Sequence, residues 1–336
     1  MGTLGVILPD NQAAYYNPAL LAFLDGDHAL LSFYPQRTVL SGSGSGCKDT
    51  YEATVLTAKV RDGIALSSLP VGIGFAYQRV RRTVGPMVER TYEQGTIEGT
   101  GNTFSWEERA DCFSVGLGYS GPVDIGVGLM YVDLAQECRD LKGSGRAFGC
   151  GLLLRLPLNG LRSTSREVGG ARLNATFCGG MSFSNYGSAI WFAGEEYTLP
   201  KTGRFGIGID VTYDSERIRW LSVFPAFELE ILFPGEDQSA MKFGMEVGLA
   251  DALFLRVGTV NAPEEGIDLN TYGLGLSSRG IKQMLWRDKL DVSGDGSNLG
   301  RFLLARLNVE FSYARVDREG HLFVDDIGYY GINIIL

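Results

Sequence analysis

The sequence predicts an all-β fold, a transmembrane antiparallel β-barrel of about fourteen strands. Three observations indicate this fold. Many segments alternate apolar and polar residues, aromatic residues stand near the ends of these segments, and no apolar run reaches the ~18–20 residues of a membrane-spanning helix. Successive side chains of a strand point to opposite faces, so each alternating segment has one apolar face. Repetition of this pattern from end to end is typical of a barrel in a membrane.

Fourteen segments are predicted to be strands, most of them near the ~9–11 residues that a tilted strand needs to cross a bilayer. In chain order they are His28–Tyr34, Tyr51–Val60, Val71–Arg79, Cys112–Tyr119, Val123–Asp133, Ala147–Leu156, Ala171–Phe183, Phe205–Tyr213, Ile218–Leu229, Met241–Leu249, Leu253–Thr259, Thr271–Ser277, Leu303–Tyr313 and Tyr329–Leu336. The segment 303–313 alternates most clearly, whereas 218–229 is apolar on both faces and the sequence does not orient it.

The connections between these segments alternate in length. The turns at 120–122 and 250–252 are tight, as expected of the periplasmic turns of an outer-membrane barrel. The long or polar connections, which the same rule places outside, are 80–111, 184–204 and 260–270. Connections 157–170 and 278–302 are long where the rule expects short inner turns.

The turn at 250–252 also predicts a register. If Leu249 and Leu253 both face lipid, Glu246 lies opposite Arg256, and both side chains point inward. Opposite charges across a strand pair contribute roughly 0.2–1 kcal/mol. We therefore predict a lumenal ion pair, with the alternative that each charge meets water instead.

The composition argues against several classes of function. A net charge of −9 disfavours nucleic acid as a partner. The sequence has no Gly-x-Ser-x-Gly elbow, no phosphate loop and no histidine placed as a base, so we predict no enzyme activity. With two histidines and no zinc-like cysteine spacing, we predict neither a metal site nor a cofactor.

The five cysteines leave at least one thiol unpaired within a monomer. They are Cys47, Cys112, Cys138, Cys150 and Cys178. The sequence leaves two interpretations open, namely one disulfide near the outer loops or five small packing residues.

The first 22 residues do not alternate. Asn17 is a good helix N-cap and Pro18 a good first helical residue, so Ala19–Leu24 is predicted to form a short apolar helix. No signal peptide is visible after Met1. On local grounds alone, this region is a small helix before the first strand.

At these residues the chain resembles the FadL-like superfamily of outer-membrane barrels, and within it the smaller PorV/PorQ-type members. The features that match, in order, are Met1-Gly2, Asp10 to Ala14, Asn17-Pro18-Ala19 and Leu21-Ala22. The resemblance implies a bacterial outer-membrane protein whose signal peptide precedes Met1 in the full precursor.

The resemblance also implies an N-terminal hatch, residues 1–27, inside a barrel formed by residues 28–336. The hatch residues are Asn17, Pro18, Ala19, Leu20 and Leu21. Physics favours a plug as well, because barrels of sixteen or more strands leave a water channel and fourteen unplugged strands would leak. Charged residues on the polar faces of strands are expected to point into the lumen. Besides Glu246 and Arg256, they are Asp210, Arg306 and Glu310. Two roles are open for them, selecting the molecules that pass or anchoring the hatch, and anchoring is favoured.

Three functions follow as hypotheses. The first is passive transport of hydrophobic, fatty-acid-like molecules by a barrel surrounded by outer-membrane lipid, with a hydrophobic ligand in the lumen. The second is a PorV-type barrel that binds exported proteins or a translocon, as in type IX secretion. The third is a soluble all-β binding protein, which requires that the apolar faces do not meet lipid.

Overall fold

We analysed a computed structural model of the chain. It describes residue 7 and residues 13–24, 29–39, 48–60, 70–93, 96–158, 171–215, 219–233, 239–262, 267–285, 307–317 and 327–335. The barrel strands within these ranges are β1 (Ala29–Val39), β2 (Lys48–Val60), β3 (Val71–Glu93), β4 (Thr96–Tyr119), β5 (Asp124–Cys138), β6 (Leu141–Pro157), β7 (Ala171–Gly187), β10 (Lys201–Ser215), β11 (Arg219–Phe233), β12 (Ser239–Leu249), β13 (Leu253–Ala262), β14 (Ile267–Ser277), β15 (Asn308–Asp317) and β16 (Ile327–Ile335).

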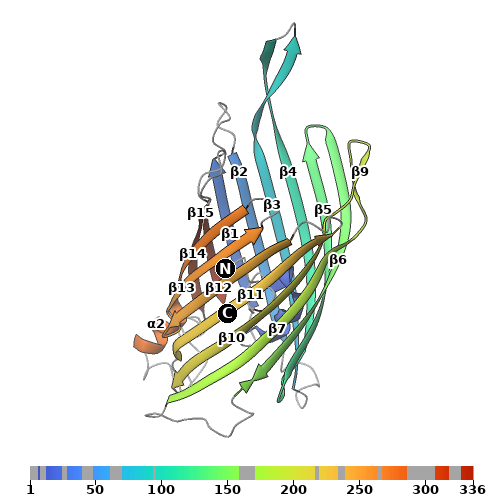
Figure 1. The fold of residues 1–336 in the computed structure, drawn as a ribbon. Coiled ribbons are helices and arrows are strands. Elements are labelled where there is room, and N and C mark those ends of the chain that lie inside the picture. Colours follow the sequence, from blue (N-terminus) through green and yellow to red (C-terminus); the bar gives the residue numbers. More distant parts are fainter. Residues whose placement is uncertain are drawn as a thin grey trace, which may run out of the picture.

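These fourteen strands form one closed antiparallel barrel (Figure 1). Each strand pairs with the next along the chain, and β1 pairs with β16 to close the ring, for example through Ser32 and Asn333. A small hairpin of β8 (Ile190–Phe192) and β9 (Glu195–Tyr197) is added in the connection between β7 and β10. The predicted closed barrel of about fourteen strands is confirmed.

The outer surface of the barrel is apolar. On β10, Phe205, Ile207 and Ile209 are exposed, whereas the alternating residues Gly206 and Gly208 are buried. Every barrel strand carries at least one exposed large hydrophobic residue, from Leu31 on β1 to Tyr330 on β16. A band of exposed large hydrophobic side chains around a closed ring of strands is typical of a barrel surrounded by lipid, so the barrel is a transmembrane one.

An aromatic row crosses β3 to β7 at a single register. Its members are Tyr77, Phe113, Tyr131, Phe148 and Tyr186, each the Cα partner of the next. The ring centroids of the first two lie 5.0 Å apart, and those of the third and fourth lie 5.4 Å apart. A girdle of this kind marks the boundary between hydrocarbon and head groups.

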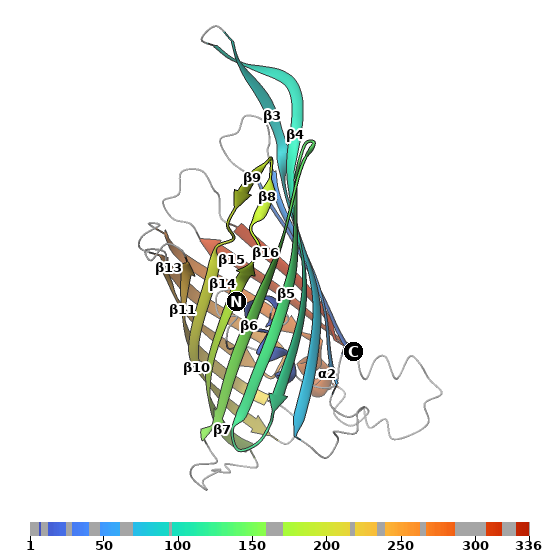
Figure 2. The same ribbon diagram turned by 90° about the vertical axis from the view of Figure 1, so that its right-hand side faces the viewer.

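The expectation of a loop over residues 80–111 is wrong, because β3 and β4 continue through it as one long hairpin beyond the barrel rim (Figure 2). Ion pairs hold the two strands together there, such as Arg81 NH2 to Glu107 Oε2 at 2.7 Å. Beyond the membrane both faces of a strand meet water, so the apolar alternation that reveals a strand disappears. Cross-strand charge pairs stabilise the ladder instead.

Several other boundaries also differ from the prediction. β5 and β6 extend to a two-residue turn at Arg139–Asp140, where Arg139 has φ 55°. The predicted loop 184–204 includes the small β8–β9 hairpin. β15 spans Asn308–Asp317, and residues 303–306 of the predicted strand lie outside the described part of the chain.

In the described part of the chain, the helical segments are α1 (Ala13–Tyr16), the 3₁₀ helix η1 (Pro18–Phe23) and α2 (Ser278–Leu285). None of the helices in the described residues is long and apolar enough to span a membrane. The four described cysteines form no disulfide with one another, and Cys47 lies outside the described residues.

Candidate functional site

Residues 13–24, here called the inner segment, lie within the ring of strands (Figures 1 and 2). Its helix η1 contacts β3, β4, β5 and β6 and, to a lesser extent, β2. Ala19, Leu20 and Leu21 are completely buried. The helix begins at Pro18 after the Asn17 cap, as predicted, although it is a 3₁₀ helix rather than an α-helix.

Asn17 connects the start of η1 to the barrel wall. Its Oδ1 accepts a hydrogen bond from the Ala19 N–H at 3.1 Å, and its Nδ2 donates to the Leu152 carbonyl on β6 at 3.1 Å. Asn17 is completely buried and cannot bond to water, so these two hydrogen bonds satisfy its side-chain amide. One side chain therefore caps the helix and binds it to the wall.

Glycines allow η1 to approach the wall at backbone distance. A Cβ at Gly74 would overlap the Leu21 carbonyl, and a Cβ at Gly128 would overlap the backbone where Pro18 joins Ala19. Gly74 lies on β3 and Gly128 on β5. On β4, between these two strands, a Cβ at Gly116 would overlap the Pro18 carbonyl in the same way. These inward glycines, here called the glycine wall, therefore fix how closely the helix can pack.

Ile7 marks a second contact with the wall, on β7 and β11. It is completely buried and packs with Cys178, Phe224 and Ala226. A Cβ at Gly208 would lie 3.0 Å from its Cδ1. The N-terminal region thus contacts the wall beyond the strands that η1 covers.

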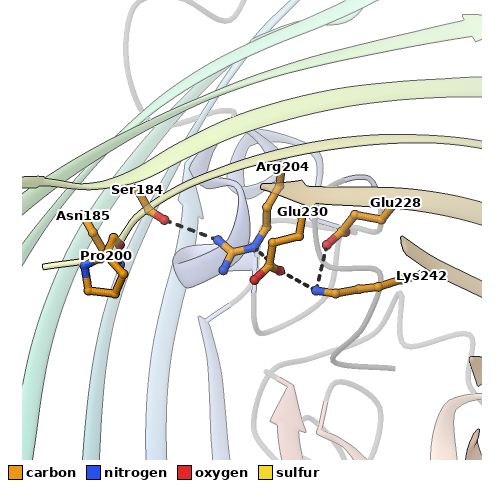
Figure 3. Close-up of polar contacts among 7 residues, drawn as sticks. All are labelled: Ser184, Asn185, Pro200, Arg204, Glu228, Glu230 and Lys242. Atoms are coloured by element: carbon orange, nitrogen blue, oxygen red, sulfur yellow. Dashed lines mark hydrogen bonds and ion pairs between the residues drawn. The ribbon is translucent and has the colours of Figure 1, made fainter. Parts of the chain in front are cut away.

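Four charged residues, three buried and the fourth (Glu230) with a side chain that is 18% exposed, form a network on β10, β11 and β12 (Figure 3). Arg204 Nε donates to Glu230 Oε2 at 3.0 Å, and Lys242 Nζ donates to the same oxygen at 2.5 Å. Lys242 also reaches Glu228 Oε1 at 3.3 Å, and Arg204 NH1 reaches Ser184 Oγ at 3.4 Å. Two cations and two carboxylates balance, which is what allows them to be buried together. We call this network the charge cluster.

The charge cluster also contacts the inner segment. The guanidinium carbon of Arg204 lies 5.3 Å from the ring centroid of Tyr16 and 6.0 Å from that of Tyr15. These are cation–π distances, and with a side chain only 7% exposed the interaction is largely desolvated. The inner segment therefore contacts the glycine wall through η1 and the charge cluster through α1.

The predicted pair Glu246 and Arg256 forms as expected in register and geometry. The two residues are Cα partners, and Arg256 Nε donates to Glu246 Oε2 at 2.6 Å. Their side chains are 15% and 24% exposed. The exposed neighbours Met245 and Leu255 point outward, so the pair faces the lumen.

The other predicted lumenal charges lie on separate strands. Asp210 is on β10 opposite Thr176, and Glu310 is on β15. Glu310 accepts hydrogen bonds from Ser277 Oγ and Asn333 Nδ2, both at 3.4 Å. Arg306 lies outside the described residues. The structure does not gather these charges into one site, and their role in anchoring remains a prediction.

Sequence reasoning missed the charge cluster. The signal was present, because Arg204 precedes the outward Phe205, and Glu228 follows the outward Phe227. Alternation alone would have turned these charges inward. The charges meet only when β10, β11 and β12 pair in the observed register. The sequence predicted a register only at the turn 250–252, which joins β12 to β13.

No protein-family model matches the chain, and no curated protein matches its sequence. Solved structures do match. The TodX deltaS2S3 mutant monoaromatic hydrocarbon channel has 11% identity and a TM-score of 0.50, covering 98% of this chain and 94% of that one. The Pseudomonas putida toluene transporter TodX has 13% identity, coverage of 97% and 92%, and a TM-score of 0.48. The Ralstonia pickettii toluene transporter TbuX has 11% identity and a TM-score of 0.46, covering 99% of this chain and 95% of that one.

At such low identity the first of these similarities shows the fold alone. Together with the apolar outer surface and the aromatic girdle, it defines the class of protein, an outer-membrane β-barrel.

Proposed function

We propose that the chain is a member of the FadL-like superfamily that allows hydrophobic small molecules to pass the bacterial outer membrane passively. In this proposal residues 1–27 are the hatch, with Asn17, Pro18, Ala19, Leu20 and Leu21 as its wall-facing part, and residues 28–336 are the barrel. The observation that carries the proposal is the packing of η1 on the glycine wall inside the lumen. The hydrocarbon channel that shares the fold supports the choice of substrate.

An interior segment excludes water and ions from the lumen. Fourteen strands enclose more space than wall side chains fill, so an unfilled lumen would conduct water and ions. The buried residues of η1 are apolar apart from its cap, so it is unfavourable for water to enter among them. A hydrophobic molecule can replace such contacts, whereas an ion would lose its hydration. The proposal needs no energy source and assigns the chain no catalytic step.

Uptake by intact cells tests this function. The chain is produced in the outer membrane of a Gram-negative host, and uptake of labelled toluene and dodecanoate is compared with that of cells carrying an empty vector. We expect faster uptake with the chain, and little steady ion conductance for the purified protein in planar bilayers. Uptake equal to the empty vector, or a large open-pore conductance, contradicts the proposal.

A second candidate is the PorV/PorQ-type role, in which the barrel binds an exported protein or a secretion complex. One observation favours it, namely the β3–β4 hairpin that extends beyond the rim (Figure 2). Among the described residues, 86–105 form strand pairs only within this hairpin, since β2 reaches Gly85 and β5 reaches Trp106. One ion pair, from Glu89 to Arg139, links this part to the β5–β6 turn. A variant that replaces 86–105 by a short turn should keep the barrel and lose co-purifying protein. If the same proteins co-purify with both forms, this role is contradicted.

A further inference from the structure

One inward-facing row of residues runs across nine strands of the barrel at a single register. Each member is the Cα partner of the next. From β14 to β6 the members are Ser277, Glu310, Asn333, Ser32, Val55, Gln78, Cys112, Val132 and Ala147. Barrel strands are tilted by about 35–45°, so a row perpendicular to them climbs along the barrel axis.

The row changes character along its length. From Ser277 to Gln78 every member except Val55 is polar, whereas the last three members belong to an apolar cluster. The polar part, here called the polar row, includes the carboxylate of Glu310 with hydrogen bonds from its two neighbours.

Three buried polar atoms of this wall have no hydrogen-bond partner among the described residues. They are Ser32 Oγ, Gln78 Oε1 and Thr57 Oγ1, the last being two residues along β2 from Val55. The residues are 0%, 4% and 1% exposed. Buried polar groups in folded proteins are nearly always paired, and leaving one unpaired is costly. These three atoms lie on the adjacent strands β1, β2 and β3 and are directed to the interior, where a hydrogen-bonding group can satisfy them.

The polar row lies largely outside the strands that the inner segment covers. The helix η1 packs mainly on β3 to β6, and the contacts of Ile7 and the two tyrosines lie on β7, β10 and β11. Most of the polar row is on β14, β15, β16 and β1. The helix η1 therefore leaves β14, β15, β16 and β1 uncovered, whereas Thr57 and Gln78 lie on β2 and β3, which it contacts. Ser32, Ser277 and Asn333 are 0%, 1% and 8% exposed, so a head group that binds the row must displace the groups that cover it.

We propose that the polar row guides the head group of the transported molecule, and that this head group is a neutral hydroxyl or amide rather than an ionised carboxylate. The inference rests on the proposed function and narrows its substrate class. Serine, threonine and amide side chains can exchange hydrogen bonds with such a head group. Glu310, the second member of the row, repels a carboxylate.

Nearby cations do not reverse this preference. On the neighbouring strand β13, Arg256 is bound to Glu246 at 2.6 Å. Lys59, two residues beyond Thr57, donates to the Leu24 carbonyl at 2.8 Å and so serves the inner segment. The negative charge of Glu310 is instead held between two neutral donors.

The test compares the uptake of labelled dodecane, 1-dodecanol and dodecanoate by cells that carry the chain, after subtraction of empty-vector uptake. We expect 1-dodecanol to enter about fivefold faster than dodecanoate, the effect of one hydrogen bond. Glu310→Gln keeps the shape of the side chain and removes its negative charge, so it should raise dodecanoate uptake and change 1-dodecanol uptake much less. Ser32→Ala should lower 1-dodecanol uptake relative to dodecane.

Matched controls are Glu137→Gln and Ser120→Ala, which change the same residue types at exposed positions. Assembly of each variant is checked by its heat-dependent gel mobility. Equal rates for 1-dodecanol and dodecanoate, unchanged by Glu310→Gln, overturn the inference and leave the proposed function standing. If none of the three molecules enters faster than with the empty vector, the proposed function fails together with the inference.

Discussion

Arg204 interacts with Glu230 and Tyr16 at the same time: its Nε lies 3.0 Å from the carboxylate oxygen and its guanidinium carbon 5.3 Å from the ring centroid. The first contact belongs to the wall and the second to the inner segment. A guanidinium is suited to both, because its edge donates hydrogen bonds while its flat face packs on an aromatic ring. The stability of the wall and the position of the segment are therefore linked through one side chain.

Replacing Arg204 by Gln should destabilise the barrel. The change leaves two buried carboxylates with Lys242 as their described cation, and breaking a buried ion pair costs about 3–5 kcal/mol. The measurement is urea unfolding in detergent, followed by gel mobility. Arg146→Gln is the matched control, because the Arg146 side chain is 71% exposed and lies 3.8 Å from Asp133. Its replacement should lower the free energy of unfolding by less than ~1 kcal/mol. Equal losses for the two variants would contradict the role of the cluster.

The Tyr15→Leu and Tyr16→Leu double variant isolates the contact with the inner segment. It keeps the ion pairs and removes both cation–π contacts, which are worth roughly 1–2 kcal/mol when desolvated. Hydrogen exchange should therefore accelerate in residues 13–24 while the barrel strands keep their protection. If protection is unchanged in residues 13–24, η1 alone holds the segment.

Adding a methyl group to the glycine wall should displace η1. In Gly128→Ala the new Cβ meets the backbone of Pro18 and Ala19, and relief requires movement of the helix at a cost of about 1–3 kcal/mol. We expect a higher ion conductance in planar bilayers, since the helix no longer seats against the wall. The control is Gly179→Ala, where the nearest atom is Phe177 Cε1 at 3.6 Å and the methyl group fits. The same conductance in both variants would show that η1 does not restrict the lumen.

Two substitutions of Asn17 separate its two hydrogen bonds. Asn17→Ser keeps a side-chain oxygen that can cap η1 and loses the donation to Leu152, whereas Asn17→Ala loses both bonds. A lost cap costs about 1 kcal/mol and a lost hydrogen bond a similar amount. Hydrogen exchange in residues 18–24 should be slowest in the wild type, intermediate in the Ser variant and fastest in the Ala variant. Exchange in the Ser variant as fast as in the Ala variant would show that the bond to the wall dominates.

The Glu246–Arg256 pair is suited to a double-mutant cycle. Because the two side chains are directly opposed and mostly buried, we expect a coupling energy of about 1 kcal/mol between Glu246→Gln and Arg256→Met. The unfolding free energies of the four proteins in urea give this value. The exposed pair Lys142 and Glu137, 3.5 Å apart, should show less coupling. A coupling near zero would mean that water satisfies each charge separately.

The sequence predicted the barrel and one register because both follow from local rules. Alternation determines which side chains face lipid, and the tight turn after Leu249 fixes the pairing with Leu253. The N-cap at Asn17 was also predictable, because its chemistry lies within three residues of the chain.

Two features lay beyond these rules. The strands past Arg79 were missed because both of their faces meet water, so Arg81 and Glu107 look like loop residues until they are paired. The interaction of Arg204 with Tyr16 joins residues far apart in the chain, and no local pattern carries that information. In both cases the sequence does not show which residue each side chain contacts in the folded chain.

The long β3–β4 hairpin gives this protein an outward reach that the remainder of the barrel does not have (Figure 2). Among the described residues, its distal part forms strand pairs only within the hairpin, so foreign peptide placed between Glu93 and Thr96 should leave the membrane-embedded ring intact. An epitope inserted there would project beyond the barrel rim, and antibodies added to intact cells should bind it if this end of the barrel faces outward, as the connection lengths predict.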